Sequence, residues 1–304
     1  MGGAAACHRC VKVGSFISCR NGDRVTAILS LLVSSLSWSL FDLARKRLTT
    51  SWQPLPLAFA LNLGVLPLYL VLWWGTGGGL ARPGYWLPGL LSVVLASVAA
   101  VAFMAALKAG ELSRLIPVLA VTPVISALAG WYWLGESLSG LQWLAMLVTV
   151  VAISGIQGGL RGCGGRPFLL MLLVAVCFGL VVVTDKLALQ HGPLFWHGLV
   201  QSLGISLVLG AVMLLRREPV NHRELSALIP ALMVFALAVL GQWHALLSLE
   251  AGVVELVKRS TGIIGALMLG RLLFAEQVRP AQVLWSILTI GMITLMLWPG
   301  AAGH

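Results

Sequence analysis

The sequence contains few charged residues. They make up 10% of its 304 positions, whereas hydrophobic residues make up 59%. A soluble domain carries roughly a quarter charged residues, so the 20 basic and 10 acidic side chains present cannot cover a soluble globule of this size. Lipid must therefore be the solvent for most of the surface. This composition excludes a cytosolic enzyme, a secreted domain and a disordered chain.

Cysteine and the common catalytic motifs are also scarce. Cys163 and Cys177 are isolated, and Cys7, Cys10 and Cys19 lie near the N-terminus without the second ligand pair that a zinc site needs. The sequence has no nucleotide-binding loop, metalloprotease helix or nucleophile elbow. We therefore expect no enzymatic activity, no metal and no other cofactor.

Ten long apolar runs divide the sequence, separated by Gly, Pro or charged residues. Each is close to the roughly 17–25 residues that a helix needs to cross the hydrocarbon core. Such runs must be helical, because backbone polar groups in lipid have to be satisfied within the segment. The runs are Thr26–Ala44, Leu55–Trp74, Leu87–Leu107, Leu115–Leu134, Leu141–Ile156, Phe168–Leu187, Leu194–Leu215, Leu225–Leu247, Val253–Phe274 and Ala281–Trp298. We expect an all-α integral membrane protein with ten transmembrane helices.

The second half of the sequence repeats the first at a single constant offset, the spacing from Lys46 to Lys186, which we call the repeat offset. The matches include polar and small positions, where chance agreement is rare. Besides the two lysines, they pair Trp38 with Phe178, Gly130 with Gly270, Glu136 with Glu276 and Gln142 with Gln282. Each half holds five helices, an odd number, so the halves must have opposite orientations in the bilayer. We expect a disordered leader at residues 1–24 and two inverted five-helix repeats at residues 25–158 and 159–304.

Small residues recur every four positions on two of the expected helices, which allows helix backbones to approach closely in lipid. The ladders are Thr122, Ser126 and Gly130 on the fourth helix, and Gly262, Ala266 and Gly270 on the ninth. We therefore expect helices four and nine to be central. Helices five and ten have few polar residues and are expected at the periphery.

The stretch Ala106–Ile156 resembles the first repeat of the drug/metabolite transporter superfamily, EamA type. The resemblance lies in an Ala-Leu helix end, a Pro-containing helix and the Leu134-Gly135-Glu136 turn, and Phe274-Ala275-Glu276 is similar to the second copy of that turn. It covers nearly the whole chain from about Val25 onward. The resemblance implies a ten-helix transporter with a cavity between its halves, lined mainly by helices one, three, four, six, eight and nine.

Helix nine carries three ionisable residues within an expected span, where such groups are usually functional. The spacing of Glu255, Lys258 and Arg259 puts them on the same side of the helix. We interpret Lys258 and Arg259 as a clamp for an anionic substrate. The alternative is an internal ion pair with snorkelling cations. The resemblance favours the clamp, because the organophosphate and nucleotide-sugar branches have a Lys-Arg pair on helix nine that contacts substrate phosphate.

Helices one and six end in charged residues that are candidates for gating or proton coupling. Lys46 and Lys186 are related by the repeat and would lie near opposite membrane faces. The remaining candidates are Asp42, Arg45 and Asp185. Either lysine is equally compatible with an ordinary interfacial cation. Asp42 and Asp185 are sharper candidates, because a carboxylate near the apolar core needs a partner or a proton.

Helix eight contains Gln242, Trp243 and His244 in an otherwise apolar run. We expect Gln242, Trp243 and the Trp38 ring of helix one to form walls of the substrate site. His244 either titrates near neutral pH or simply bonds a neighbouring helix.

Several other polar residues are weaker candidates. Asn62, His197 and Gln201 lie on helices that are expected to be less central. Glu136 and Glu276 are interpreted as structural turn or cap residues.

Together these features predict a secondary transporter that moves a small polar metabolite by alternating access. An anionic metabolite, phosphorylated or carboxylated, is the favoured substrate class. The alternatives are a proton-coupled amino-acid or drug exporter of the same fold, or a flippase for lipid-linked sugars. The expected partners are the substrate, the bilayer, and a coupling proton or counter-substrate. The net charge of +10 is not taken as a sign of nucleic-acid binding.

We expect a multi-pass protein of a bacterial plasma (inner) membrane. The oligomeric state is open and compatible with a monomer. Basic loop residues place both termini outside by the positive-inside rule, whereas the resemblance suggests cytoplasmic termini, so the orientation is open as well.

Overall fold

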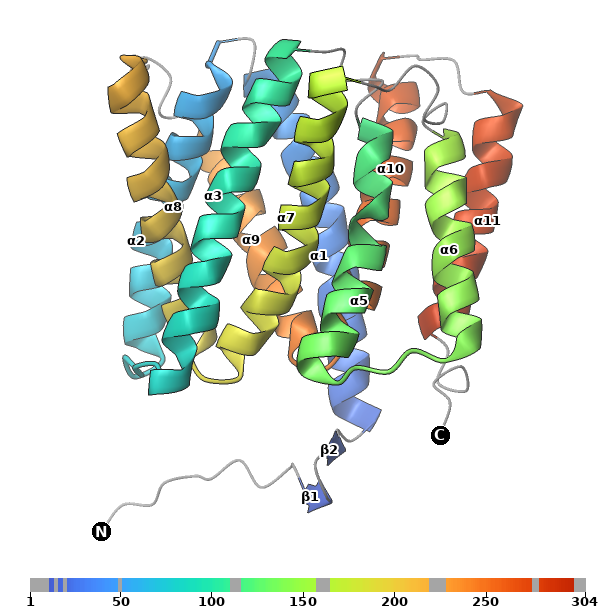
Figure 1. Cartoon of the computed structure of the whole chain (residues 1–304), viewed down its shortest axis with the longest axis horizontal. Helices are drawn as coiled ribbons and strands as arrows, with labels where there is room; N and C mark the ends of the chain where they lie inside the picture. The colour runs from blue at the N-terminus through green and yellow to red at the C-terminus, as the bar shows by residue number, and fades with distance from the viewer. Residues whose placement is uncertain are drawn as a thin grey trace.

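The computed structural model describes residues 11–13, 16–18, 21–48, 51–109, 116–156, 165–218, 228–274 and 279–297. These residues form ten α-helices, two 3-10 helices and one short pair of strands. The α-helices stand side by side, and successive helices run in opposite directions (Figure 1). We call the end of the bundle at which α1 begins and α11 ends the lower end, as drawn in Figure 1, and the opposite end the upper end.

Each of the ten apolar runs contains an α-helix within its described residues, as predicted. The helices are α1 (Asn21–Leu48), α2 (Pro54–Gly75), α3 (Trp86–Ala109), α5 (Thr122–Leu134), α6 (Gly140–Ile156), α7 (Gly165–Leu189), α8 (Leu194–Arg216), α9 (Leu228–Leu246), α10 (Ala251–Phe274) and α11 (Pro280–Leu297). Several of them are longer than the predicted runs, because polar and small flanking residues continue the helices beyond the apolar segments.

The fourth predicted helix is divided in the structure. Residues Ile116–Val121 form the 3-10 helix η2, and the α-helix begins only at Thr122. Pro123 lies in the first turn of α5, where its missing N–H would have had no partner within the helix. Pro117 lies near the start of η2 and Pro123 at the start of α5, so neither proline kinks a continuous α-helix.

The expected leader contains some regular structure. Strands β1 (Val11–Val13) and β2 (Phe16–Ser18) pair antiparallel, and α1 already begins at Asn21. The β-branched and aromatic residues of these two segments flank a Gly-Ser pair in the sequence, which is a typical hairpin pattern. The rest of residues 1–20 lies outside the described part of the chain.

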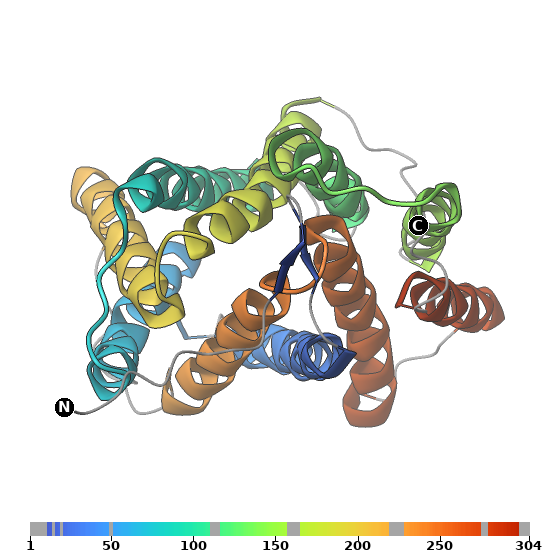
Figure 2. The ribbon, with the colours of Figure 1, turned by 90° about the horizontal axis from the view of Figure 1, so that it is seen from below.

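The helices pack in pairs from different halves of the chain. The main contacts join α3 to α7, α1 to α9, α2 to α8, α5 to α10 and α6 to α11. Figure 2 shows α6 and α11 together at one edge of the bundle, as the sequence predicted for helices five and ten. Helices α5 and α10 contact each other and also α7 and α1 respectively, so they lie further inside.

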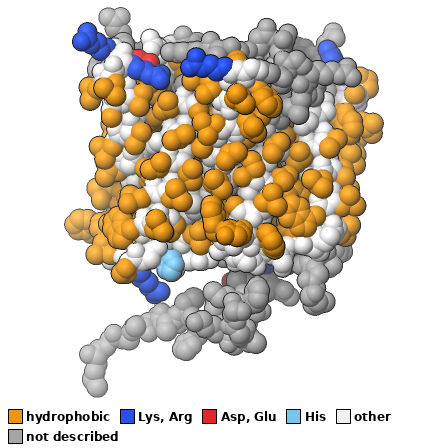
Figure 3. Space-filling model, in the orientation of Figure 1, with side chains coloured by type: hydrophobic (Ala, Val, Ile, Leu, Met, Phe, Trp, Pro, Cys, Tyr) orange, Lys and Arg blue, Asp and Glu red, His pale blue; other side chains and the backbone are white. Residues whose placement is uncertain are grey.

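The surface has the composition expected for contact with lipid. Hydrophobic side chains cover the middle of the face in Figure 3, and the Lys and Arg side chains drawn there lie at its two rims. Within the described residues, seven helices are long and apolar enough to cross a membrane, and α5 and α6 are shorter apolar helices. The seven are Asp23–Arg45, Pro54–Gly75, Pro83–Phe103, Gly165–Leu189, Leu194–Arg216, Leu228–Leu246 and Pro280–Leu297. The chain is therefore a multi-pass integral membrane protein.

Two close helix contacts are related by the repeat offset. A methyl group added to Gly179 of α7 would lie 2.7 Å from Ile125 Cγ2 of α5, and one added to Gly265 of α10 would lie 2.8 Å from Ser39 Oγ of α1. Gly179 corresponds to Ser39, and Ile125 to Gly265. In the first contact the glycine is on α7, and in the second it is on α10, the counterpart of α5. In both contacts a glycine allows the two helices to approach closely in lipid.

A pair of glutamine contacts joins α6 to α11 at both ends. Gln142 Nε2 donates to the Met296 carbonyl at 3.4 Å, and Gln282 Nε2 donates to the Ile156 carbonyl at 3.1 Å. In each case Oε1 of the same glutamine also accepts from a backbone N–H three residues earlier, at 2.9 Å. Each residue of one set corresponds to its counterpart in the other by the repeat offset.

We predict that Gln142→Ala lowers the free energy of unfolding by about 1–3 kcal/mol, because it removes the side-chain donor from the carbonyl of the buried Met296. Thermal unfolding in detergent, followed by circular dichroism, measures the effect. The control is Gln190→Ala, whose exposed side chain lies in the turn after α7. An unfolding temperature that Gln142→Ala leaves at the value of the control would contradict a structural role for this contact.

Candidate functional site

The charged residues of α10 form a compact ion cluster. Glu255 is fully buried, and each of its carboxylate oxygens pairs with one cation. Arg259 Nε donates to Oε1 at 2.8 Å, and Lys258 Nζ contacts Oε2. The side chains of Lys258 and Arg259 remain 15% and 21% exposed. Two cations thus share one carboxylate, so the cluster has a net charge of +1 and both cationic side chains are partly exposed.

Two aromatic rings related by the repeat lie against the cations. Lys258 Nζ lies 5.7 Å from the ring centre of Trp38 on α1, and Arg259 Cζ lies 5.6 Å from that of Phe178 on α7. At such distances a cation is attracted to the ring face. Trp38 Nε1 also donates to Gln242 Oε1 of α9 at 3.1 Å. The structure therefore brings together five predicted substrate-site residues, Lys258, Arg259, Glu255, Trp38 and Gln242.

Phe178 was not singled out as a candidate from the sequence. Its apolar side chain resembles many others in the helices, and its only sequence signal is that it is the repeat partner of Trp38.

The other two predicted substrate-site residues lie elsewhere. The Trp243 ring is buried, and its Nε1 donates to Asp185 Oδ2 at 2.9 Å, which places it in a different polar network. His244 lies in the last turn of α9, and its side chain is exposed. Neighbouring residues on a helix point in different directions, so the Gln242-Trp243-His244 run cannot face a single site.

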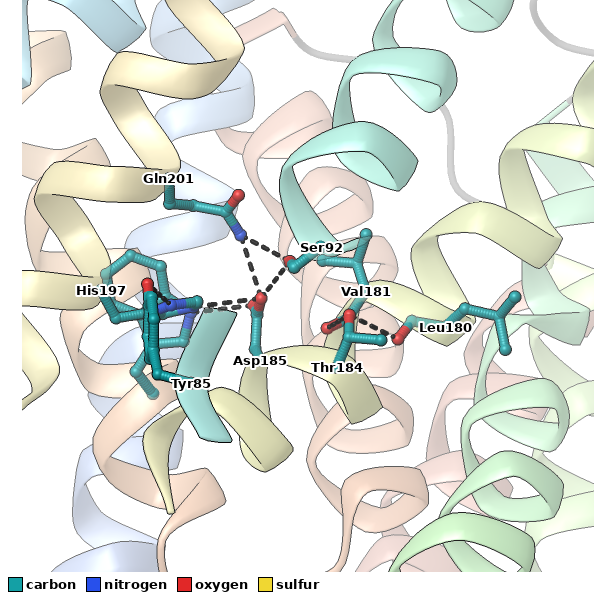
Figure 4. Close-up of polar contacts among 9 residues, drawn as sticks. Tyr85, Ser92, Leu180, Val181, Thr184, Asp185, His197 and Gln201 are labelled. Atoms are coloured by element: carbon teal, nitrogen blue, oxygen red, sulfur yellow. Dashed lines mark hydrogen bonds and ion pairs between the residues drawn. The ribbon is translucent and has the colours of Figure 1, made fainter. Parts of the chain in front are cut away.

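Asp185 of α7 is the centre of that second network (Figure 4). Its Oδ1 accepts from Gln201 Nε2 of α8 at 2.9 Å, contacts His197 Nε2 of α8 at 3.2 Å, and accepts from the Ser92 hydroxyl of α3. Trp243 of α9 supplies the bond to Oδ2. All five residues are buried. One carboxylate therefore ties four helices together near the lower end.

The network continues to the short 3-10 helix η1 (Pro83–Tyr85), which precedes α3. Tyr85 Oη lies 2.9 Å from His197 Nδ1, and the tyrosine is fully buried. Its ring fits against Gly89 and Gly192, where an added methyl group would lie 2.7 Å from ring carbons. Side chains at these positions would displace the ring.

Four members of this network were missed or ranked low from the sequence. His197 and Gln201 were considered weak because α8 was expected to be less central, and Tyr85 and Ser92 were not singled out. The available signal was the i, i+4 spacing of His197 and Gln201, which puts both polar side chains on one face of an apolar helix.

Lys186 follows Asp185 and holds the opposite side of α7. Its Nζ donates to Glu136 Oε1 and to the Leu249 carbonyl, both at 2.6 Å. Glu136 Oε2 accepts a hydrogen bond from the Ala251 N–H at 2.9 Å and so caps the start of α10. This contact agrees with the interpretation of Glu136 as a cap residue. The end of α7 is therefore fixed to the start of α10 on one side and to α3, α8 and α9 on the other.

The Leu-Gly-Glu turn explains the position of Glu136. Gly135 has a left-handed conformation with φ 66°, which suits glycine and ends α5. The Glu136 N–H then bonds back to the Gly130 carbonyl at 3.2 Å. The turn thereby directs the Glu136 carboxylate toward α7 and α10.

The candidates at the end of α1 are arranged differently. Asp42 and Arg45 form an exposed ion pair at 2.8 Å within one helical turn. Arg45 Cζ also lies 5.8 Å from the centre of the Phe41 ring and 6.0 Å from the centre of the Phe103 ring. The side chain of Lys46 and the residue Glu276 lie outside the described part of the structure. Within that part, no group of three or more His, Cys, Asp or Glu residues is arranged to hold a metal.

Residues 25–157 match the sequence profile of the EamA-like transporter family. A comparison with curated proteins returned no match. A solved structure described only as "Crystal structure of protein" is similar to this chain, with a TM-score of 0.75 and 16% sequence identity. The similarity covers 92% of this chain and 99% of the other, and at this identity it shows the fold alone. The match over residues 25–157 confirms the resemblance found in the sequence: this part of the chain is similar to the EamA-like transporter family, consistent with the drug/metabolite transporter superfamily.

Proposed function

We propose that the protein is a secondary transporter for a small polar anionic metabolite, phosphorylated or carboxylated, which it moves by alternating access between two inverted five-helix halves. The observation that carries this proposal is the pair of partly accessible cations, Lys258 and Arg259, held on the buried Glu255. The rings of Trp38 on α1 and Phe178 on α7 lie against these cations, and Gln242 of α9 accepts a hydrogen bond from the Trp38 indole.

The inverted arrangement is supported by helix direction and by contacts. Helix α1 begins at the lower end, whereas α7, its counterpart in the second half, begins at the upper end (Figure 1). Under the repeat offset, the contact of α3 with α7 corresponds to that of α1 with α9, and the contact of α5 with α7 corresponds to that of α1 with α10. The reciprocal bonds of Gln142 and Gln282 obey the same relation. A pseudo-twofold axis in the membrane plane would account for the helix directions, the helix contacts and the two glutamine bonds.

The cation pair supports an anionic substrate. A charge in a membrane protein is stable only beside a partner, and Glu255 holds both cations while leaving an excess of one positive charge. The planar fork of Arg259 suits a phosphate or carboxylate group, and Lys258 adds a point charge. Each cation lies against a different aromatic ring, Lys258 against Trp38 and Arg259 against Phe178.

The lower end of the bundle is closed by polar contacts in this structure. The ion pair of Lys186 with Glu136 joins α7 to the turn after α5, and the bond to Leu249 joins it to the segment before α10. For a substrate to pass this end, α7 has to separate from these segments. We assign Lys186 and Glu136 to the gate at the lower end.

We predict that Arg259→Ala lowers transport at least tenfold, because a hydrogen bond to a charged group contributes about 1.5–3 kcal/mol. Uptake of labelled phosphorylated and carboxylated metabolites into proteoliposomes provides the measurement. Insertion and purification should be unchanged. Arg216→Ala, at the exposed end of α8, is the control for loss of one positive charge. Transport by Arg259→Ala at the rate of that control would remove the clamp from the proposal.

We predict that Lys186→Met slows turnover while leaving substrate binding intact. The variant keeps the length of the side chain but loses the contacts that close the lower end, and the substrate cluster on α10 is untouched. Transport rate and ligand-induced thermal stabilisation are measured in parallel. If binding and rate fell together with the unfolding temperature, Lys186 would be a purely structural residue.

A proton-coupled exporter of amino acids or drugs is the second candidate function. The observation that favours it is the buried Asp185, which contacts a histidine within the membrane region. Sensitivity of transport to a proton uncoupler, without competition by anions, would support this function over the first. A response to lipid-linked sugars alone would instead support a flippase.

A further inference from the structure

We propose that Arg45 of α1 is an anion-selecting residue at the upper end of the bundle. It attracts the substrate anion on its way to the ion cluster of α10, and its partner Asp42 limits this attraction. We call Glu255, Lys258 and Arg259 the α10 cluster. The selection rests on the anionic substrate class proposed above, but it is made by residues that belong neither to that cluster nor to the gate at the lower end.

Arg45 lies on the side of α1 that faces the α10 cluster. Trp38, Asp42 and Arg45 are spaced i, i+4 and i+7, so their side chains share one side of the helix. The Trp38 ring on this side lies against Lys258 Nζ. Because α1 begins at the lower end, Arg45 lies about 10 Å further along the helix axis toward the upper end than Trp38. Arg45 is therefore placed between the α10 cluster and the upper end.

Two aromatic rings fix the position of the Arg45 guanidinium. Its Cζ atom lies 5.8 Å from the centre of the Phe41 ring and 6.0 Å from that of the Phe103 ring, distances at which a cation is attracted to a ring face. Phe41 is buried and stacks on Phe235 of α9, with 4.9 Å between ring centres. Phe103 packs against the apolar core that α3 shares with α7. Both rings are thus held by packing, and the guanidinium is held by the rings.

The contact with Phe103 carries the Arg45 side chain across the bundle. Helix α1 packs against α9 and α10, whereas α3 packs against α7 and α8. Figure 2 shows α1 and α3 on opposite sides of the bundle. A side chain that joins these two helices therefore lies over the interior. The side chains of Arg45 and Asp42 are nevertheless 43% and 52% exposed, so a ligand can reach them from the upper end.

The side of α10 between its ion cluster and the upper end is open. Gly262 follows Lys258 and Arg259 by four and three residues, so it lies one turn nearer the upper end on the same side of α10. A methyl group added to Gly262 would meet no atom within 4 Å beyond the adjacent backbone, and the residue is partly exposed. A route for a ligand toward the cluster requires such a space.

The ion pair with Asp42 leaves Arg45 suited to weak anion binding. In the described part of the structure, Arg45 donates to Asp42 Oδ1 at 2.8 Å, which uses one of the five N–H donors of a guanidinium. Guanidinium donors match the geometry of carboxylate and phosphate groups. The negative charge of Asp42 offsets that of Arg45, whereas the α10 cluster has a net charge of +1. An anion is therefore held more weakly at Arg45 than at the cluster and moves on.

The equivalent positions at the lower end are closed and carry the opposite charge. Under the repeat offset, Arg45 corresponds to Asp185. The ring that Arg45 contacts, Phe103, corresponds to Trp243. Asp185 and Trp243 are buried and bonded to each other, whereas Arg45 is half-exposed. In this conformation the upper end is therefore the one at which a charged side chain meets an incoming ligand.

Thiol labelling tests the selection without any substrate. Gly262→Cys supplies a thiol one turn above the α10 cluster, in a protein whose five native cysteines are replaced by alanine. The thiol is modified by two reagents of similar size, the anionic 2-sulfonatoethyl and the cationic 2-(trimethylammonio)ethyl methanethiosulfonates. The ratio of the anionic to the cationic rate is compared among variants, because this ratio cancels differences in the reactivity of the thiol.

We expect Arg45→Gln to lower this ratio several-fold and Asp42→Asn to raise it, because the two changes remove opposite charges from the route of the reagent. Arg45→Lys keeps the charge and is expected to keep most of the ratio. Added salt is expected to reduce the differences by screening. The matched control is Arg216→Gln, which removes a positive charge from the exposed end of α8.

Three results would count against the selection. A ratio that Arg45→Gln leaves at the value of the Arg216→Gln control would overturn it. An equal fall of the ratio in Arg45→Lys would also overturn it, since the side chain would then act through packing and not through its charge. A ratio that Asp42→Asn leaves unchanged would overturn the limiting role of Asp42.

The outcomes separate this selection from the proposed function. If the ratio depends on Arg45 but Arg259→Ala transports normally, the selecting residue stands and the anion clamp falls. If the ratio does not depend on Arg45 and Arg259→Ala abolishes transport, the clamp stands and the selecting residue falls.

Discussion

A charged side chain inside a membrane protein is stable only beside a partner, and this constraint determines which helices meet in the bundle. Glu255 holds Lys258 and Arg259, so α10 carries its charges through the apolar interior as one cluster. Asp185 and Lys186 are adjacent in sequence but face different sides of α7, and they contact different segments of the chain. The two helices that carry these charges, α7 and α10, are also those whose relative movement alternating access would require.

The two halves share a frame but differ in chemistry. Packing and capping contacts follow the repeat offset, as in the two glutamine bonds between α6 and α11. The charged residues of the α10 cluster do not follow it, because the positions equivalent to Glu255, Lys258 and Arg259 are Leu115, Val118 and Leu119. Repeated small and polar residues are thus found in both halves, while the ion cluster of Glu255, Lys258 and Arg259 is found in the second half.

The sequence predicted the parts of the structure that depend on local patterns. Ten apolar runs became ten helices, and one helix face brought Glu255, Lys258 and Arg259 together. Contacts between distant helices were harder to predict, because His197 and Ser92 have no special spacing relative to Asp185 and meet it only through the packing of α3, α7 and α8. His244 shows the opposite case: its residue type suggested a role in the site, but its position on α9 turns it outward. The position of a residue around the helix decides whether its side chain points into the bundle or outward. The presence of a polar residue in an apolar run does not by itself predict that direction.

The central claim is that the α10 cluster binds an anion between the two halves. Thermal stabilisation of the purified wild-type protein across a panel of soluble ligands tests it most directly, since the measurement assumes no direction of transport. The account predicts that phosphorylated or carboxylated metabolites raise the unfolding temperature and compete with one another, and that neutral amino acids and cationic drugs do not. Stabilisation by cationic drugs alone, or by lipid-linked sugars alone, would contradict the account.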